Sequence, residues 1–181
     1  QALNAAGQSL WLDNITRPLL DSGTLARYID ELDVTGLTSN PTIYDRAIGG
    51  TDAYDAEIAE AARTGTSGED TFFGVALSDL RRAADLFRPV HDRTGGVDGF
   101  VSLEVSPLLA YDAEATVAQA KRLHAQGDRP NLFIKIPGTP EEPESMVVCP
   151  LLVGGEVIGT LNLARMGGDE AHFSRDEFEL V

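Results

Sequence analysis

Short apolar segments alternate with longer segments of helical periodicity over the first 140 residues. Four apolar segments have the length of strands and end near a polar residue or a proline: 9–13, 35–39, 100–105 and 132–136. Between them, apolar side chains recur every three or four residues, which predicts helices over 22–32, over about 42–92 with a break between Gly65 and Gly68, and over 113–125. Strands that alternate with helices form successive βα units with right-handed connections. The pattern therefore predicts an α/β fold built on four parallel strands.

The pattern changes near residues 141–144, which are charged, contain a proline and show no apolar period. Two strands joined by a Gly-Gly pair predict an antiparallel hairpin over 146–164, and a Ser-to-Glu capping pattern predicts a helix from residue 174. We therefore expect two parts, 1–140 and 141–181. Unpaired sheet edges favour further pairing. The hairpin is expected to lie against an exposed edge, and two copies of the chain are expected to form a homodimer.

Composition and charge narrow the range of partners. The 181-residue chain has a formal charge of −15, so a nucleic acid would be repelled, although a local positive site can still take a small anion. No stretch of about 18 apolar residues is present, so we expect no transmembrane helix. Cys149 is the only cysteine and cannot form an internal disulfide, which fits a cytoplasmic protein. Because the chain begins without methionine and stops inside a helical pattern, we expect a fragment.

Polar residues stand at the carboxyl ends of the four expected strands: Asp13, Asn40, Glu104 and Lys135. In a parallel α/β barrel this rim is where catalytic groups gather. Lys135 lies in an apolar run, where the ammonium form is disfavoured and a neutral amine can attack a carbonyl to form an imine. Asp13 and Glu104 are the carboxylates available for the proton transfers.

Each of these residues also has a purely structural interpretation. A strand lysine is often an edge residue with its amine in water, an aspartate at a strand end is often a cap, and Asn40 before Pro41 is a common turn initiator. Glu104 can be a solvated carboxylate at the rim. The three histidines are too scattered along the chain to suggest a metal site.

Four segments resemble the strand motifs of bacterial transaldolases, especially the branch that is fused to a glucose-6-phosphate isomerase. They are GQSLWLDNITRP at 7–18, TGLTSNPTI at 35–43, FVSLEVS at 100–106 and FIKIPGT at 133–139. The resemblance implies a (β/α)8 barrel and transfer of a dihydroxyacetone unit between sugar phosphates in the pentose phosphate pathway, without metal or organic cofactor. It also implies that Lys135 is the Schiff-base nucleophile and that Asp13 and Glu104 serve acid–base steps, Glu104 through a water. Asn40 and Thr38 would hold substrate hydroxyls.

The chain departs from that family after the lysine strand. A complete barrel needs about 250 residues, so only a partial barrel of about four βα units is expected. The later strands would supply the phosphate-binding arginine, and they are missing. Residues 146–181 instead resemble the end of a GAF domain, a small-molecule sensory module, with its hairpin and final helix.

Two alternatives to a transaldolase-like enzyme stay open. One is a non-catalytic GAF-type module for ligand sensing or interaction, and the other is a chimeric fragment without a function of its own. The junction near residues 139–145 can come from a natural fusion, an engineered recombinant or a sequence-assembly artefact.

Overall fold

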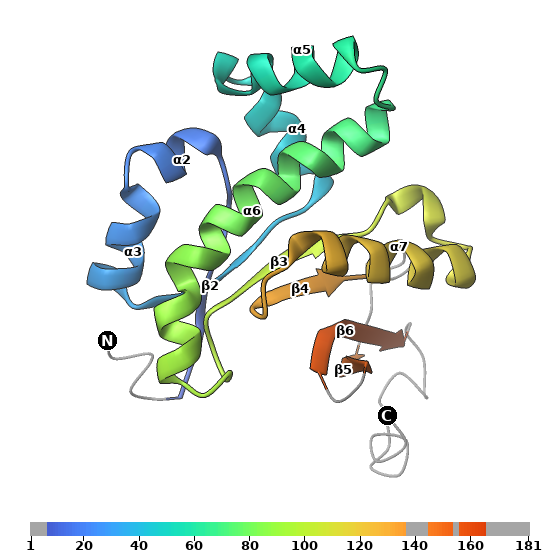
Figure 1. Ribbon diagram of the computed structural model, residues 1–181. Helices are drawn as coiled ribbons and strands as arrows, with labels where there is room; N and C mark the ends of the chain where they lie inside the picture. Colours follow the sequence, from blue (N-terminus) through green and yellow to red (C-terminus); the bar gives the residue numbers. More distant parts are fainter. Residues whose placement is uncertain (1–6, 137–144, 154–155, 166–181) are drawn as a thin grey trace.

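The computed structural model describes residues 7–136 in full and the backbone of residues 145–153 and 156–165. Its strands form one six-stranded sheet in the order β1-β2-β3-β4-β6-β5 (Figure 1). The four parallel strands are β1 (Leu10–Asp13), β2 (Val34–Thr38), β3 (Phe100–Glu104) and β4 (Leu132–Lys135). Strands that follow one another in sequence are neighbours in the sheet, as expected for consecutive βα units. The predicted α/β fold with four parallel strands is confirmed and is consistent with part of a barrel.

The helices fall close to the predicted ranges. They are α2 (Arg17–Asp21), α3 (Thr24–Leu32), α4 (Pro41–Gly49), α5 (Asp55–Arg63), α6 (Gly68–Arg93) and α7 (Ala113–Gly127), with 3-10 turns η1 (Asp52–Tyr54) and η2 (Pro107–Leu109). The break expected between Gly65 and Gly68 is present, and Ser67 caps the start of α6 by accepting a hydrogen bond from the Asp70 backbone N–H.

Helix α2 was not predicted, and the helix expected over 22–32 begins at Thr24 instead. The side chain of Thr16 caps α2 by accepting a hydrogen bond from the Leu19 backbone N–H at 3.1 Å, and Pro18 lies in the first turn. Gly23, in the left-handed conformation with φ of 71°, separates the two helices. A five-residue helix is too short to produce a recognisable apolar period.

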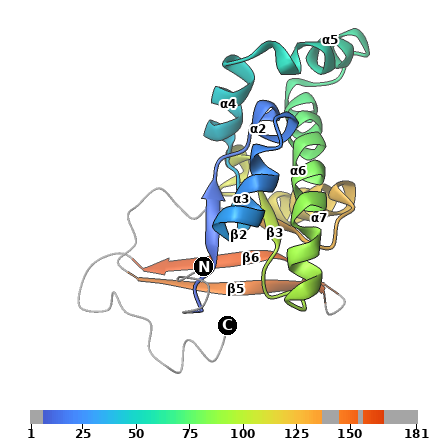
Figure 2. The same cartoon turned by 90° about the vertical axis from the view of Figure 1, so that its left-hand side faces the viewer.

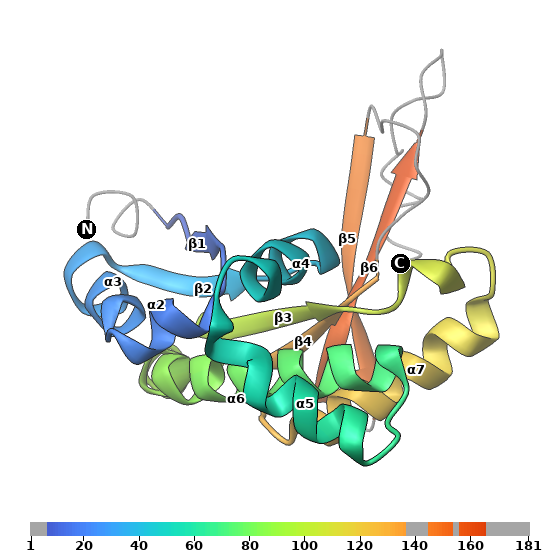
Figure 3. The same cartoon turned by 90° about the horizontal axis from the view of Figure 1, so that it is seen from above.

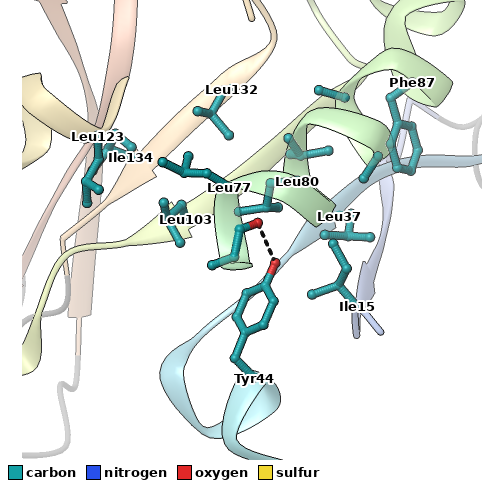
Figure 4. Close-up of a cluster of buried hydrophobic side chains, with 14 of the residues drawn as sticks. Ile15, Leu37, Tyr44, Leu77, Leu80, Phe87, Leu103, Leu123, Leu132 and Ile134 are labelled. Atoms are coloured by element: carbon teal, nitrogen blue, oxygen red, sulfur yellow. Dashed lines mark hydrogen bonds between the residues drawn. The ribbon is translucent and has the colours of Figure 1, made fainter. Parts of the chain in front are cut away.

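The hydrophobic core lies between the parallel strands and the long helix α6 (Figure 4). Leu77, Leu80 and Phe87 of α6 are buried in one cluster with Val101 and Leu103 of β3. Helices α3, α6 and α7 lie on the same side of these strands (Figure 3). Burial of apolar area at roughly 25 cal/mol per Å² makes this layer the main source of stability.

Successive strand residues point to opposite faces of a sheet. Since Leu37, Val101, Leu103, Leu132 and Ile134 face α6, the alternate positions face away from it. We call this second surface the open face. From β1 to β4 it carries the following residues: Trp11, Asp13, Gly36, Thr38, Phe100, Ser102, Glu104, Phe133 and Lys135.

The antiparallel hairpin consists of β5 (Ser145–Val153) and β6 (Glu156–Arg165), as predicted from the Gly-Gly pair. Strand β6 pairs in parallel with β4, with Lys135 opposite Thr160, so the hairpin extends the sheet at the β4 edge as expected. The two strands run side by side at a steep angle to β1 (Figure 2), in keeping with the twist of sheets. The helix expected from residue 174 lies outside the described residues. Among the helices that are described, none has the length and apolar content needed to cross a membrane.

Candidate active site

The carboxyl ends of the parallel strands bring the predicted site residues to one rim. Asp13 of β1 is opposite Thr38 of β2, Thr38 is opposite Ser102 of β3, and Glu104 of β3 is opposite Lys135 of β4. Because side chains alternate with a period of two, these residues all project from the open face. The structure therefore gathers on one surface the polar residues that the sequence places far apart.

Lys135 and Glu104 form an ion pair on this face. Lys135 Nζ lies 2.5 Å from Glu104 Oε1, and the two side chains are 35% and 12% exposed. Their partial burial separates them from most of the solvent, and a carboxylate at this distance can accept a proton from the amine. The pair combines a potential nucleophile with a potential base at the ends of two adjacent strands.

Asp13 lies at the other end of the row. Its side chain is exposed and makes no hydrogen bond or ion pair with another described residue. Strands β2 and β3 stand between Asp13 and the lysine strand. The carboxylate is thus accessible to a molecule bound over the open face, and it does not contact the Lys135–Glu104 pair through a shared hydrogen bond.

Asn40 has a structural task as well as its place at the rim. Strand β2 ends at Thr38, and Asn40 is the N-cap of α4, where its Oδ1 accepts a hydrogen bond from the Ile43 backbone N–H at 2.9 Å. Of its side chain, the amide Nδ2 has no partner among the described residues. Asn40 is therefore the turn and cap residue of the structural interpretation, while its amide N–H groups stay available at the rim.

Ser102 was not singled out from the sequence, although it belongs to this row. Its Oγ donates a hydrogen bond to Thr38 Oγ1 at 3.0 Å, and its side chain faces the same side as Glu104 two residues later. The alternation within FVSLE was the available signal, because positions 102 and 104 share a parity. A serine in a strand is common enough that this parity alone did not select it.

Aromatic side chains lie beneath the polar row on the open face. The rings of Phe100 and Phe133 stack with centroids 3.9 Å apart, and the Trp11 indole covers Gly36, where an added Cβ would lie 2.4 Å from the ring. Phe133 precedes Lys135 by two residues on the same side of β4. The Phe133 ring and the Lys135 amine therefore project from the same side of β4.

A second polar cluster was also missed, and it lies on the helical side of the sheet. Arg17 Nε is 2.9 Å from Asp79 Oδ1, Arg17 Nη2 is 2.8 Å from Glu57 Oε2, and the Tyr54 hydroxyl donates to Asp79 Oδ2 at 3.0 Å. The Asp79 side chain is fully buried. Burial, together with the neighbouring Asp79 carboxylate, raises the pKa of Tyr54 to about 12. These groups come from α2, η1, α5 and α6, so no local pattern points to them.

An apolar hollow of about 340 Å³ adjoins the rim between η2 and α7. Its lining includes Val105, Ile136, Thr116 and Val117 but none of the predicted site residues. The His91 ring packs edge-on against Phe100 with centroids 5.0 Å apart. The part of the chain that the structure describes contains no group of three or more His, Cys, Asp or Glu that could hold a metal ion.

Comparison with known proteins identifies relatives of this chain. Residues 10–153 match the family described as Transaldolase/Fructose-6-phosphate aldolase. The chain is 50% identical over 141 residues to the transaldolase of Thermobifida fusca, which is 78% of this chain and 38% of that protein. It is 47% identical over 137 residues to transaldolase 2 of Streptomyces coelicolor, which is 76% of this chain and 37% of that protein. For the transaldolase of an Arthrobacter species the identity is 48% over 147 residues, covering 81% and 39%. The chain thus spans about two fifths of the length of these curated relatives.

Proposed function

This chain belongs to the transaldolase/fructose-6-phosphate aldolase family, and on that premise we propose that Lys135 forms an imine with the carbonyl carbon of a ketose phosphate. The observation that carries the proposal is the 2.5 Å contact between Lys135 Nζ and Glu104 Oε1 on the open face. The corresponding reaction of a complete protein is transfer of a dihydroxyacetone unit from a ketose phosphate to an aldose phosphate in the pentose phosphate pathway. Neither a metal nor an organic cofactor takes part in it.

The proposed steps use the residues of the rim. Glu104 accepts a proton from Lys135, and the free amine attacks the ketone carbon to give a carbinolamine. Glu104 then returns the proton to the carbinolamine hydroxyl, which leaves as water, and the protonated imine forms. The bond between C3 and C4 of the sugar then breaks, and its electron pair moves into the imine to form an enamine. A carboxylate, which we propose to be Asp13, takes the proton of the C4 hydroxyl, and the aldose phosphate leaves. Thr38 and Asn40 can donate hydrogen bonds to substrate oxygens.

Imine formation and turnover make different demands on the protein. An imine needs an accessible amine, which this half of the barrel supplies. Turnover also needs a phosphate anchor, because precise positioning is worth up to about 7–11 kcal/mol of the barrier. Among the described residues of the open face, Lys135 is the only cation. Arg17 lies on the other side of the sheet, where it is paired with Asp79 and Glu57. We therefore expect slow imine formation and turnover that is absent or lower by many orders of magnitude.

Borohydride reduction tests this proposal. The chain is incubated with fructose 6-phosphate, reduced, digested and mapped by mass spectrometry. We expect the sugar adduct at Lys135 and loss of the adduct in Lys135→Ala. Lys121 is the only other lysine of the chain and is exposed on α7, so Lys121→Ala should be labelled as the wild type is. A coupled assay for transfer to an aldose phosphate runs in parallel.

Two outcomes would count against these expectations separately. Equal labelling of the wild type and Lys135→Ala would show that the proposed imine does not form at this lysine. Robust transfer activity of the purified chain would show that the open face already holds the phosphate well enough, so the expected loss of turnover would be wrong.

The GAF-like interpretation of residues 141–181 stays a prediction. The family match continues to residue 153, beyond the junction expected near 139–145, and so includes β5. The described part of this segment is the antiparallel hairpin. No contact of the described residues favours a ligand-sensing role or a chimera over the transaldolase-like reaction.

A further inference from the structure

Two hydroxyl groups connect β2 and β3 near the Lys135–Glu104 pair, at a position two residues before Glu104 along β3. Ser102 Oγ donates a hydrogen bond to Thr38 Oγ1 at 3.0 Å, and the two residues are direct partners in the sheet register. Ser102 is only 5% exposed. Its hydroxyl is therefore shielded from water and fixed by its position between two paired strands.

This bond determines which way the Thr38 hydroxyl can act. A hydroxyl has one proton and two lone pairs. Because the Ser102 proton occupies one lone pair of Thr38 Oγ1, the Thr38 proton must point elsewhere. No described residue accepts it, and Thr38 is partly exposed on the open face. The Thr38 hydroxyl is thus prepared to donate a hydrogen bond to a molecule over that face.

We infer that Ser102 is a positioning residue that orients the Thr38 hydroxyl as a donor to a hydroxyl oxygen of a ketone bound at Lys135. The inference rests on the proposed function, since it requires a ketone at that lysine. It assigns to Ser102 a part in selecting hydroxylated ketones over plain ketones. Without the Ser102 proton, the Thr38 hydroxyl can rotate and bond elsewhere, and the selectivity falls.

A second hydrogen bond, at the same β2–β3 boundary, allows the orienting role of Ser102 to be distinguished from a merely structural role. Ser39 Oγ donates to the Ser102 backbone carbonyl at 2.7 Å, so it also ties β2 to β3, but it does not involve the Thr38 hydroxyl. Ser39 is fully buried. Ser39→Ala therefore removes a hydrogen bond between the same strands and is the matched control.

The test compares borohydride trapping at Lys135 with dihydroxyacetone and with acetone, which lacks both hydroxyl groups. The ratio of the two trapping rates cancels the chemistry common to both ketones. We expect Ser102→Ala to lower the ratio by about three- to tenfold, as loss of one neutral hydrogen bond would. Ser102→Thr keeps the donor and should keep the ratio, and Ser39→Ala should leave the ratio unchanged.

A double-mutant cycle completes the design. If Ser102 acts through Thr38, then adding Ser102→Ala to Thr38→Val lowers the ratio no further than Thr38→Val alone. If Ser102→Ala does not fold, Ser102→Cys keeps the size with a weaker donor and should show the decrease. Trapping at Lys135 with an unchanged ratio in Ser102→Ala or its Cys substitute would overturn the inference and leave the proposed function intact. Absence of any trapping that depends on Lys135 would overturn both.

Discussion

Arg17, Tyr54 and Asp79 form a buried polar cluster that holds the segment following β1. The Arg17 backbone N–H donates to the Tyr54 hydroxyl at 2.8 Å, that hydroxyl donates to Asp79, and the Arg17 guanidinium lies over the Tyr54 ring. Since Arg17 follows Asp13 by four residues, the cluster also limits the freedom of the strand end that carries Asp13. Removing one member leaves at least one buried polar atom of its neighbours without that hydrogen-bond partner, which costs more than the bond itself contributes.

The Tyr54 phenol should make stability depend on alkaline pH. Burial raises the pKa of Tyr54 from its usual 10 to about 12, so the folded state holds this proton more tightly than the unfolded state. The resulting stabilisation is present in full below pH 10 and is lost as the pH rises through 12. The free energy of unfolding in urea should therefore fall over this interval, and Tyr54→Phe should reduce the fall while costing about 1–2 kcal/mol at neutral pH.

Tyr111, which is 86% exposed, provides the control. Tyr111→Phe should keep the pH dependence of the wild type. If the free energy of unfolding fell equally at alkaline pH in Tyr54→Phe and in the wild type, another group would be the cause of the fall.

At the scale of secondary structure, β1 and β2 fit together because Gly36 has no side chain. The Trp11 indole occupies the space where a Cβ at Gly36 would be, with the nearest ring atom at 2.4 Å. Trp11 and Gly36 are direct partners in the strand register. The close approach of the Trp11 indole therefore requires glycine at position 36. The backbone angles of Gly36 do not require it.

Gly36→Ala should displace the indole and loosen the β1–β2 pair. We expect a loss of about 1–3 kcal/mol in the free energy of unfolding, as found for overpacked cores. Trp11 is the only tryptophan, so its fluorescence should shift in the folded state. Gly74→Ala is the matched control, because a Cβ there meets nothing within 4 Å in the middle of α6. That change should stabilise by about 0.5–1 kcal/mol through helix propensity. Unaltered fluorescence and stability in Gly36→Ala would contradict the close fit.

At the scale of the whole molecule, the described sheet has two open edges. Strand β1 pairs only with β2, and β5 pairs only with β6. Closed barrels have no such edges, whereas part of a barrel presents unpaired N–H and C=O groups to other chains. The hairpin pairs with β4 through β6, so β5 instead of β4 is the unpaired edge strand on this side of the sheet. The expected homodimer follows from this geometry and stays a prediction.

Light scattering at increasing protein concentration should show association that depends on the β1 edge. Leu10 begins β1 and is 41% exposed, and Leu10→Lys places a charge on this edge, which opposes pairing with a second chain. The variant should shift the population towards monomer. Leu32, at the end of α3 and 54% exposed, gives the control Leu32→Lys with the same change in charge and no edge strand. A clean monomer of the wild type at high concentration would contradict the prediction.

The amino-acid sequence by itself was enough to predict the parallel strands, most helices and the β5–β6 hairpin. These elements depend on local signals: apolar runs ended by Pro41 or Pro107, a period near 3.6 in α6, and the Gly154-Gly155 pair. The candidate residues Asp13, Glu104 and Lys135 could also be predicted from the sequence, because consecutive βα units bring the carboxyl ends of their strands to one rim.

Only the tertiary structure decided which polar groups meet. Ser102 and Thr38 are 64 residues apart, and Arg17 and Asp79 are 62 apart, so neither contact leaves a periodic trace in the sequence. The 2.5 Å contact of Lys135 with Glu104 likewise needs a particular register of β3 against β4, and a shift by one residue would turn either side chain to the helical face. Local chain chemistry specifies the elements, whereas packing between distant segments sets the register and with it the geometry of the site.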